Sequence, residues 1–322
     1  GLGRSGTTWL GAIVASHPKI LYRFEPFHRL QKTQPAIKEM YDLIMSDNIS
    51  PEDVPSIYKC LLPAYPESEK PPFFTKDFSS RLSFGKSFFW PLARKNAFLS
   101  PIFRSLYTPT EKPFLIFKEV DYSDMVVTFL NKTEIPVVYI IRHPCAVTSS
   151  IVRGQKNALM PMPEDRLVVL KRVLPKHAPK LAEIYEHKLE ELTTIEQEAL
   201  YWVVQTGRAL RACQQSPNGL VVIYEDLTER PVEIAKQVFQ HFNLTMPEEA
   251  IAFIEESSNK SLTSAIKRGE VKMNKYFTIF RDPKVARDRW KEEMTPEDKM
   301  RVMEIVKDSP EFSFGVEKGF WS

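Results

Sequence analysis

A glycine-rich segment at residues 1–10 carries the clearest chemical signal in the chain. It reads G-x-x-x-x-G-T-T and leads directly into the apolar helical spacing of Leu10, Ile13 and Val14. A glycine-rich turn that enters a helix points several backbone N–H groups at one place, with the positive end of the helix dipole behind them. The pattern therefore predicts a phosphate-binding loop. The alternative is a turn into a helix that binds no anion.

The cation of this loop lies inside it. In the version of the loop that binds nucleoside triphosphates, a Lys directly precedes the Ser or Thr. This chain has Thr7 at that position and carries Arg4 within the loop instead. A loop that keeps the phosphate-binding backbone but moves the cation indicates a different leaving group.

A second pair of candidate phosphate ligands follows a buried strand. Residues 135–141 contain β-branched and aromatic side chains and no charge, which predicts a buried strand. Arg142 ends this strand, Pro144 breaks it, and a predicted helix then carries Ser150. The Arg fork and the Ser hydroxyl could both reach one phosphate. The alternative for Arg142 is a surface salt bridge.

These two motifs together resemble the nucleotide site of sulfotransferases. The segment R-S-G-T-T-W-L at 4–10 resembles the loop with which that family binds the 5′-phosphosulfate of 3′-phosphoadenosine 5′-phosphosulfate (PAPS). The pattern strand–Arg–x–Pro–x5–Ser at 142–150 resembles the family's site for the 3′-phosphate of the cofactor. Residues 220–244 and 290–315 are similar to two further family segments, in the same order. Residues 31–112 and 155–195 show no specific match, and we expect them to determine acceptor specificity.

The resemblance implies a role for most residues of the loop. Arg4, the backbone of residues 4–8 and the hydroxyls of Thr7 and Thr8 would stabilise charge on the leaving phosphate. Trp9 would stack on the adenine, although packing in the core is the alternative. The implied cofactor-binding set is Gly3, Arg4, Ser5, Gly6, Thr7, Thr8, Trp9, Arg142 and Ser150. PAPS is thus implied as the donor and 3′-phosphoadenosine 5′-phosphate (PAP) as the product, with no metal.

A third cofactor contact near the C-terminus has no assignment from the sequence. Several cations lie in the right stretch, but none has the family's usual spacing before Trp290. They are Arg268, Lys275, Arg281 and Arg287.

Transfer to an alcohol calls for a general base, because an alcohol is almost fully protonated at pH 7. The cytosolic small-molecule branch of the family uses a His two residues after a strand-end Lys. Lys118 matches that Lys here, but Val120 occupies the position of the His. Residues 20–28 instead resemble the carbohydrate- and protein-modifying branches, in which a Glu soon after the loop helix is the base. We therefore predict Glu25 as the base and His28 as the second candidate.

Each of these side chains also has a structural interpretation. Glu25 could be a carboxylate paired with Arg23 or Arg29, and His28 could be an ordinary surface or core histidine. Lys118 would bridge the leaving oxygen and the sulfonate, unless it only forms an ion pair. Two strand-end acids are weaker candidates for the base, Glu119 and Asp121. The pair Glu225-Asp226 could imitate an acidic magnesium site, and we interpret it as structural.

Composition is that of a soluble enzyme rather than a nucleic-acid-binding or membrane protein. The 322 residues are 43% hydrophobic, the net charge is only +3, and no run of 18 apolar residues occurs. Three widely spaced cysteines, Cys60, Cys145 and Cys213, argue against a disulfide scaffold and have no metal-ligand spacing. We therefore expect a cytoplasmic location, with the Golgi or secretory lumen as the alternative if an N-terminal anchor has been removed.

The order of predicted elements indicates an α/β fold with a central parallel sheet flanked by helices and a phosphate-binding loop. We expect residues 1–322 to form one sulfotransferase domain, and we expect a strand ahead of the loop, upstream of Gly1. Residues 50–72 read as an irregular proline-rich segment, and residues 112–118 as a strand. The aromatic and basic stretch 78–107 is interpreted as a helical lid packed on the core, with an acceptor- or partner-binding surface as the alternative.

The sequence therefore favours a PAPS-dependent sulfotransferase that uses in-line transfer and a carboxylate base. The acceptor would be a hydroxyl of a carbohydrate, a peptide, a lipid or a polyketide. A P-loop kinase or NTPase is an alternative, although it would need Lys at position 7 and a strand-end Asp for Mg²⁺. A module that binds PAPS or PAP without catalysis is the other alternative.

Overall fold

Four short strands form the centre of the computed structural model, which describes residues 1–157, 159, 166–258 and 283–322. The strands are β1 (Ile20–Phe24), β2 (Phe114–Lys118), β3 (Val137–Ile141) and β4 (Gly219–Ile223). They form two parallel pairs, β1 with β2 and β3 with β4. The predicted α/β class with parallel strands is confirmed.

Two of the strands begin later than their sequences predict. β2 begins at Phe114 rather than residue 112, and β3 begins at Val137 rather than residue 135. In each case a proline, Pro113 or Pro136, directly precedes the first paired residue. Proline has no N–H to donate to a ladder, so pairing begins one residue after it.

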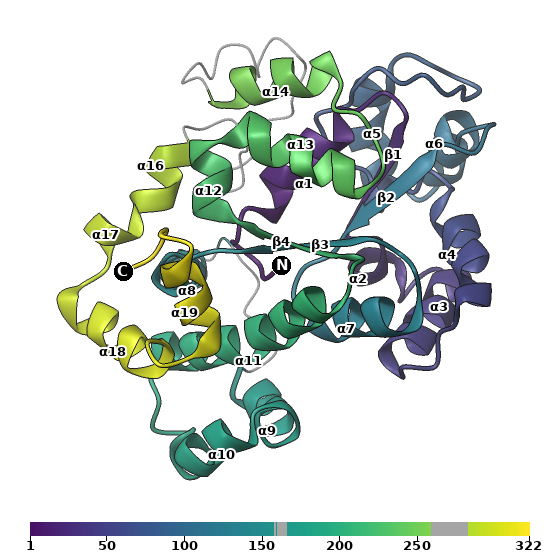
Figure 1. Ribbon diagram of the computed structural model, residues 1–322. Coiled ribbons are helices and arrows are strands. Elements are labelled where there is room, and N and C mark those ends of the chain that lie inside the picture. The colour runs from purple at the N-terminus through teal and green to yellow at the C-terminus, as the bar shows by residue number, and fades with distance from the viewer. Residues whose placement is uncertain (158, 160–165, 259–282) are drawn as a thin grey trace.

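Helices cover both faces of the strands because successive strand residues point to opposite sides. On one face Ile20, Ile140 and Val222 pack in a cluster with α1 (Thr7–Ala15), α13 (Pro231–His241) and α14 (Glu248–Ser258). On the other face the cluster joins Tyr139, Ile141 and Ile223 to α7 (Ser123–Lys132), α8 (Pro144–Lys156) and α11 (Thr194–Gln215). Figure 1 shows α1 and α13 above the strands and α11 below them.

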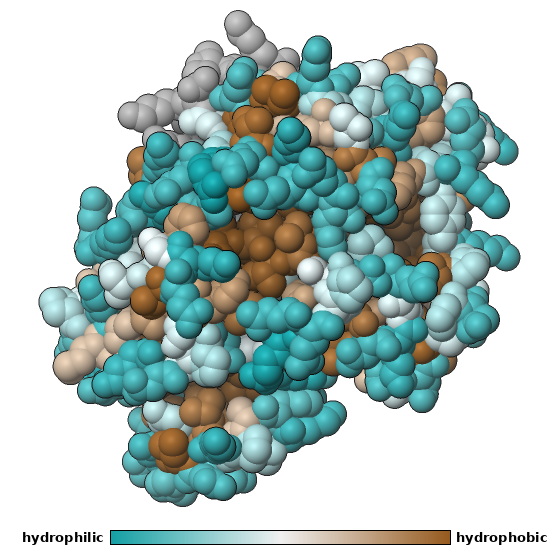
Figure 2. Space-filling view, viewed as in Figure 1, coloured by the Kyte–Doolittle hydropathy of each residue, from teal (hydrophilic) through white to brown (hydrophobic). Residues whose placement is uncertain are grey.

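The remaining helices extend this three-layer arrangement. Beside the β1–β2 pair lie α2 (Pro26–Leu30), α3 (Pro35–Met45), α4 (Val54–Leu61), α5 (Lys86–Lys95) and α6 (Leu99–Tyr107). α9 (Arg166–His177) packs on α11 and α10 (Pro179–Tyr185) on α9, and α12 (Tyr224–Glu229) follows β4. The C-terminal helices are α16 (Pro283–Asp288), α17 (Trp290–Glu293), α18 (Pro296–Val306) and α19 (Pro310–Glu317). Figure 2 shows hydrophobic side chains gathered in the middle of the same view, with hydrophilic surface around them.

The aromatic stretch 78–107 divides between core and surface. Trp90, Phe103 and Tyr107 are buried, as expected of helices that pack their aromatic rings on the core. Phe88 and Phe98, in contrast, are 81% and 86% exposed. Packing on the core is therefore confirmed for part of this stretch, whereas Phe88, on α5, and Phe98, just before α6, face solvent.

The three cysteines are all buried and free. Cys60 lies on α4, Cys145 on α8 and Cys213 on α11. Among the described residues, no helix is long and apolar enough to cross a membrane.

Candidate active site

The glycine-rich loop adopts the backbone that a phosphate-binding loop requires. Arg4 and Gly6 both have positive φ angles, of 71° and 90°, and Gly6 directly precedes the first residue of α1. A Cβ atom at Gly6 would lie 2.2 Å from the ring of Tyr224, so only glycine fits this position. The tight turn and the close approach of Tyr224 thus explain the second glycine of the motif.

Three successive backbone donors at the helix start are available to a ligand. The N–H groups of Gly6, Thr7 and Thr8 have no acceptor in the described part of the chain. The amide of Gly3, in contrast, donates to Asp121 Oδ1 at 3.1 Å, and that of Ser5 donates to a carbonyl within the loop. Helix N-termini with unbonded amides attract anions, so these residues fit a phosphate group.

Arg142 lies beside this loop and has neutral hydrogen-bond partners. It is buried; its Nη1 donates to the carbonyl of Arg4 at 2.9 Å, and its Nη2 donates to the carbonyl of Ala286 at 2.6 Å. The guanidinium also stacks over the Tyr224 ring, 4.5 Å from its centroid. Its Nε is buried and has no partner in the described residues. A buried donor without an acceptor is costly, which favours an anionic ligand here.

Ser150 completes this side of the site. Pro144 begins α8, the His143 ring caps it by accepting from the Cys145 N–H at 3.2 Å, and the helix carries Ser150 back toward the loop. Ser150 Oγ accepts from Arg4 Nε at 3.0 Å. The structure therefore brings Arg4, Arg142 and Ser150 together from segments 138 and 146 residues apart. We call these three residues, together with the backbone amides of Gly6, Thr7 and Thr8, the loop side of the site.

Glu25 and Lys118 meet at the ends of β1 and β2. The parallel register places Phe24 opposite Lys118, and the Glu25 N–H donates to the Lys118 carbonyl at 2.7 Å. The Lys118 ammonium then lies 2.5 Å from Glu25 Oε1, and Arg29 lies 3.0 Å from Oε2. Both predicted side chains are thus adjacent. The ion pair with Arg29 is present, whereas Arg23 bonds to Glu69 instead.

The charges around Glu25 set its protonation. Burial raises the pKa of Glu25, but the Lys118 ammonium and the Arg29 guanidinium outweigh burial and hold that pKa below its usual value. Burial also lowers the pKa of Lys118, and the charge of Glu25 opposes that effect. Glu25 is therefore ionised at neutral pH, in contact with two cations.

Glu119 supports Glu25 in a way that the sequence does not reveal. Its Oε1 accepts from the Phe27 N–H at 2.7 Å and from the His28 N–H at 3.4 Å, so it caps the start of α2 directly after Glu25. Burial, with a smaller effect of the Glu25 charge, raises the pKa of Glu119 to about 8. The only signal in the sequence is an acid beside the strand-end Lys118. That signal has meaning only once the β1–β2 register is known.

Two further predicted residues have side-chain contacts outside the Glu25–Lys118 pair. His28 is exposed on α2, and its ring contacts that of Tyr122 at a centroid distance of 6.5 Å. Trp9 is only 6% exposed, packs in the core, and donates its indole N–H to Ser257 Oγ at 2.9 Å. The structure therefore agrees with the packing alternative for Trp9, and adenine stacking stays a prediction.

The C-terminal cations give a partial answer about the third cofactor contact. Arg268, Lys275 and Arg281 lie outside the described residues. Arg287 pairs with Glu229 at 2.8 Å and with Asp288 at 2.7 Å.

The segment that contains Trp290 packs on the strand end. The Trp290 ring stacks on His143 at 4.5 Å, with an angle of 13° between the rings. Glu225 accepts from the His143 N–H and from the Trp321 indole, both at 3.1 Å, which agrees with the structural interpretation of this acid. No group of three or more potential metal-binding side chains occurs among the described residues.

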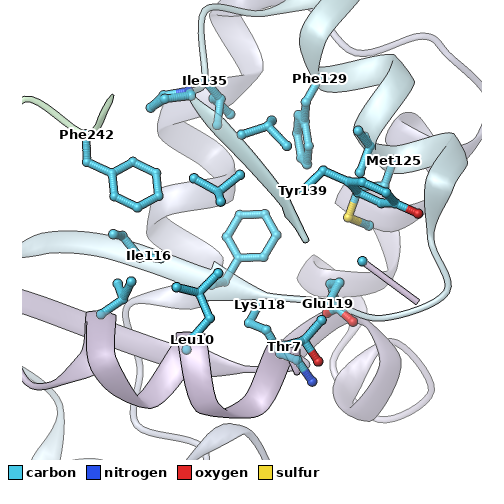
Figure 3. A pocket seen from close by; sticks show the side chains of 18 of the residues that line it. Thr7, Leu10, Ile116, Lys118, Glu119, Met125, Phe129, Ile135, Tyr139 and Phe242 are labelled. Carbon is cyan, nitrogen blue, oxygen red and sulfur yellow. The ribbon is translucent and has the colours of Figure 1, made fainter. Parts of the chain in front are cut away.

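A cavity of about 310 Å³ lies between β2 and β3 (Figure 3). Apolar side chains of β2, β3, α1 and α7 form most of its wall, while Thr7, Lys118 and Glu119 lie at one end. Within the described residues, β2 pairs only with β1, and β3 pairs only with β4. The cavity is therefore a gap between two strand edges.

With this geometry established, comparison with known proteins identifies the family. The sequence matches the sulfotransferase domain family over residues 1–312, so the chain belongs to that family. It is a sulfotransferase, and the reaction of the family is sulfuryl transfer. No curated protein matches the sequence.

Two solved structures align with most of this chain but share little sequence identity with it. A sulfotransferase domain from the curacin biosynthetic pathway is 14% identical, with 95% of each chain covered and a TM-score of 0.46. A sulfotransferase domain from the Synechococcus PCC 7002 olefin synthase is 17% identical, with 94% of this chain and 90% of that chain covered and a TM-score of 0.44.

Proposed function

We propose that this sulfotransferase moves the sulfuryl group of PAPS to an acceptor hydroxyl, with Glu25 as the general base. The observation that carries the proposal is the contact between Glu25 and Lys118 at the adjacent ends of β1 and β2. This contact places a proton acceptor and a cation side by side. They lie at the same strand ends that the phosphate-binding loop faces in an α/β fold.

The loop side supplies the groups that an anionic nucleotide needs. The free amides of Gly6, Thr7 and Thr8 would hold the 5′-phosphate, and Arg142 with Ser150 would hold the 3′-phosphate. The unpartnered Nε of Arg142 supports this assignment, because a phosphate oxygen would give it an acceptor. PAPS, when bound, supplies the activated sulfuryl group.

The ends of β1 and β2 supply Glu25, the group that takes the proton from the acceptor hydroxyl. In the reaction the acceptor oxygen forms a bond to sulfur, the bond from sulfur to the leaving phosphate oxygen breaks, and the acceptor proton passes to Glu25. Because Lys118 and Arg29 keep Glu25 ionised, this carboxylate needs no prior deprotonation. Lys118 would also stabilise the charge that develops on the leaving oxygen. No step requires a metal ion.

The apolar cavity between β2 and β3 is not assigned to the acceptor. It is bounded by two strand edges that have no partner at that side among the described residues. The expectation of a single domain over residues 1–322 stays a prediction.

The direct test is transfer of labelled sulfate from PAPS, with EDTA present, to a panel of polysaccharides, peptides, phenols and lipid alcohols. We expect labelling of one acceptor class. Phosphate transfer from ATP that depends on Mg²⁺, with PAPS inert, would instead indicate a kinase. Tight binding of PAP with neither transfer nor hydrolysis of PAPS would indicate a binding module.

A further inference from the structure

Three cations surround one aromatic ring beside Glu25. The Phe24 ring centroid lies 4.0 Å from the Lys70 ammonium, 4.4 Å from the Lys118 ammonium and 4.8 Å from the Arg29 guanidinium carbon. Phe24 is the last residue of β1 and directly precedes Glu25. The three positive charges therefore lie around the predicted general base.

Lys70 is fixed in this place by its neighbour in the chain. Glu69 is buried and bonds to Arg23 at 2.6 Å and to Lys86 at 2.9 Å. Arg23 also donates to the carbonyls of Leu61 and Leu62. This buried network anchors residue 69, and Lys70 then lies against the face of Phe24 rather than extending into solvent.

The charges in this cluster do not balance. Glu25 is already shared between Lys118 and Arg29, one on each carboxylate oxygen. Lys70 has no ion pair or hydrogen bond in the described part of the chain, and its contact is the Phe24 ring. Burial, and next the positive charge of Lys118, lower the pKa of Lys70 to about 7. An anion placed beside Lys70 would favour the ammonium form and so oppose this lowering of the pKa.

The position of Lys70 separates it from the loop side. Arg142 and Ser150 follow β3, which lies across the cavity from β2, whereas Phe24 belongs to β1 on the other side of β2. At the strand ends, the order in space is therefore Arg142 after β3, Lys118 on β2, and then Phe24 and Glu25 at the end of β1. A nucleotide held between Arg142 and Lys118 leaves Lys70 to the molecule that approaches Glu25.

We propose that Lys70 binds an anionic group of the acceptor, a carboxylate or a sulfate ester on the same molecule as the reactive hydroxyl. The acceptors of this enzyme are then acidic alcohols. The inference rests on the proposed function, because it takes Glu25 as the group that faces the acceptor.

The first test compares acceptors that differ in one charge. Sulfate transfer is measured to methyl β-glucuronide and methyl β-glucoside, and to 3-hydroxydecanoate and its methyl ester. The enzymes are the native protein, Lys70→Gln, Lys70→Arg and Lys95→Gln, the last removing an exposed lysine at the end of α5.

We expect the native enzyme to favour the acidic member of a pair by about tenfold in kcat/KM, as a charge-assisted contact provides. Lys70→Gln should lose this preference while Lys70→Arg and Lys95→Gln keep it, and the KM for PAPS should stay unchanged in all. Equal use of both members, or a preference that survives in Lys70→Gln, would overturn the inference. A higher KM for PAPS in Lys70→Gln would assign Lys70 to the donor instead and would also overturn it.

The pH dependence adds a readout that a structural role would not move. Lys70 is faced by Lys118, Glu25, Arg29 and Arg94. Its ammonium form prevails below about pH 7, so the KM for the acidic acceptor should rise as pH increases through 7. The KM for the neutral partner should stay flat, and so should both values in Lys70→Gln.

A second test needs no turnover, which separates this inference from the proposed function. A lysine with a lowered pKa reacts readily near neutral pH, so labelling of Lys70 by trinitrobenzenesulfonate can be followed in the protein saturated with PAP. Excess glucuronate should slow the labelling at least severalfold, whereas glucose should not. Labelling that glucuronate leaves unchanged would overturn the inference even if sulfate transfer is found, and PAP binding is measured separately.

Discussion

The two sides of the site hold their cations in different ways. On the loop side, Arg142 is bonded to the carbonyls of Arg4 and Ala286, which carry no net charge. On the β1–β2 side, Lys118 and Arg29 are bonded to the carboxylate of Glu25. A cation with neutral partners keeps its full charge for a ligand, whereas a cation paired with a carboxylate tunes that carboxylate.

This difference indicates a division of labour between binding and chemistry. The loop side fits the proposed binding of anions, because it combines Arg142 with amides that have no acceptor in the described part of the chain. On the β1–β2 side, two cations hold one carboxylate ionised, and Lys70 lies beside them outside that pairing. Substitutions on the two sides should therefore affect different steps.

The largest effect is expected from Glu25→Gln. This change keeps the shape of the side chain but removes the proton acceptor, so we expect kcat to fall by about 10²- to 10⁴-fold, with PAP affinity within a few-fold of native. Initial rates and calorimetric titration with PAP measure the two quantities. The matched control is Glu39→Gln, an exposed glutamate on α3. If Glu25→Gln keeps the native turnover, Glu25 is not the general base, and the β1–β2 side has no separate role in the chemical step.

The next effect is expected from Arg142→Ala. Loss of a charge-assisted contact is worth about 1.5–3 kcal/mol, so the affinity for PAP should fall about ten- to a hundredfold. The affinity for adenosine 5′-phosphate, which lacks the 3′-phosphate, should change little. Arg172→Ala, on the exposed surface of α9, is the control. Equal loss for both nucleotides would mean that Arg142 supports the loop rather than the 3′-phosphate.

The pH dependence sharpens the role of the two cations around Glu25. Activity needs the ionised carboxylate and is lost as pH falls through its pKa, which lies below the ordinary value of about 4.3. The acidic limb of the rate profile should therefore lie below the range of an ordinary glutamate. Arg29→Gln removes one of the cations that lower this pKa, so its acidic limb should appear at higher pH. The dependence of kcat/KM on pH is measured for the native enzyme and for Arg29→Gln, with circular dichroism to confirm folding. Acidic limbs at the same pH in both enzymes would contradict an effect of Arg29 on Glu25.

The smallest effect is expected from Ser150→Ala. Its hydroxyl accepts from Arg4 and would donate to the 3′-phosphate, and a single hydrogen bond contributes about 0.5–1.5 kcal/mol. PAP affinity should therefore fall about two- to tenfold, with kcat for bound substrate nearly unchanged. A drop in kcat without a drop in PAP affinity would mean that Ser150 acts in the chemical step, and would contradict the separation of binding and chemistry between the two sides.

The sequence predicted most of the elements and the loop side, because those signals are local. The β-branched run before Arg142, Pro144 after it and the glycine turn before α1 each act over a few residues. The strand starts were off by two residues because proline sets where pairing begins. Glu25 and Lys118 were each predicted only through the family resemblance, and their contact with each other was not predicted.

The rest of the site depends on contacts that no local pattern encodes. Lys70 comes from residues 50–72, which the sequence predicts to be irregular but which contain the helix α4, so that prediction was wrong for residues 54–61. Lys70 reaches Phe24 only because Glu69 is anchored by Arg23, 46 residues earlier. Glu119 caps α2 across 92 residues. Such contacts follow from strand register and buried ion pairs, which appear only in three dimensions.

The long-range contacts of Arg142 mean that ligand binding can be detected from the thermal stability of the protein. The Arg142 guanidinium bonds to the carbonyls of residues 4 and 286, which are 138 and 144 positions away in the chain, so the proposed nucleotide site cannot exist in the unfolded state. A ligand that binds only the folded state at a hundred times its Kd adds about 2.7 kcal/mol to stability. Melting temperature alone should therefore rise by several degrees with PAP. Acceptor fragments can be screened by the same shift, without any assay of catalysis.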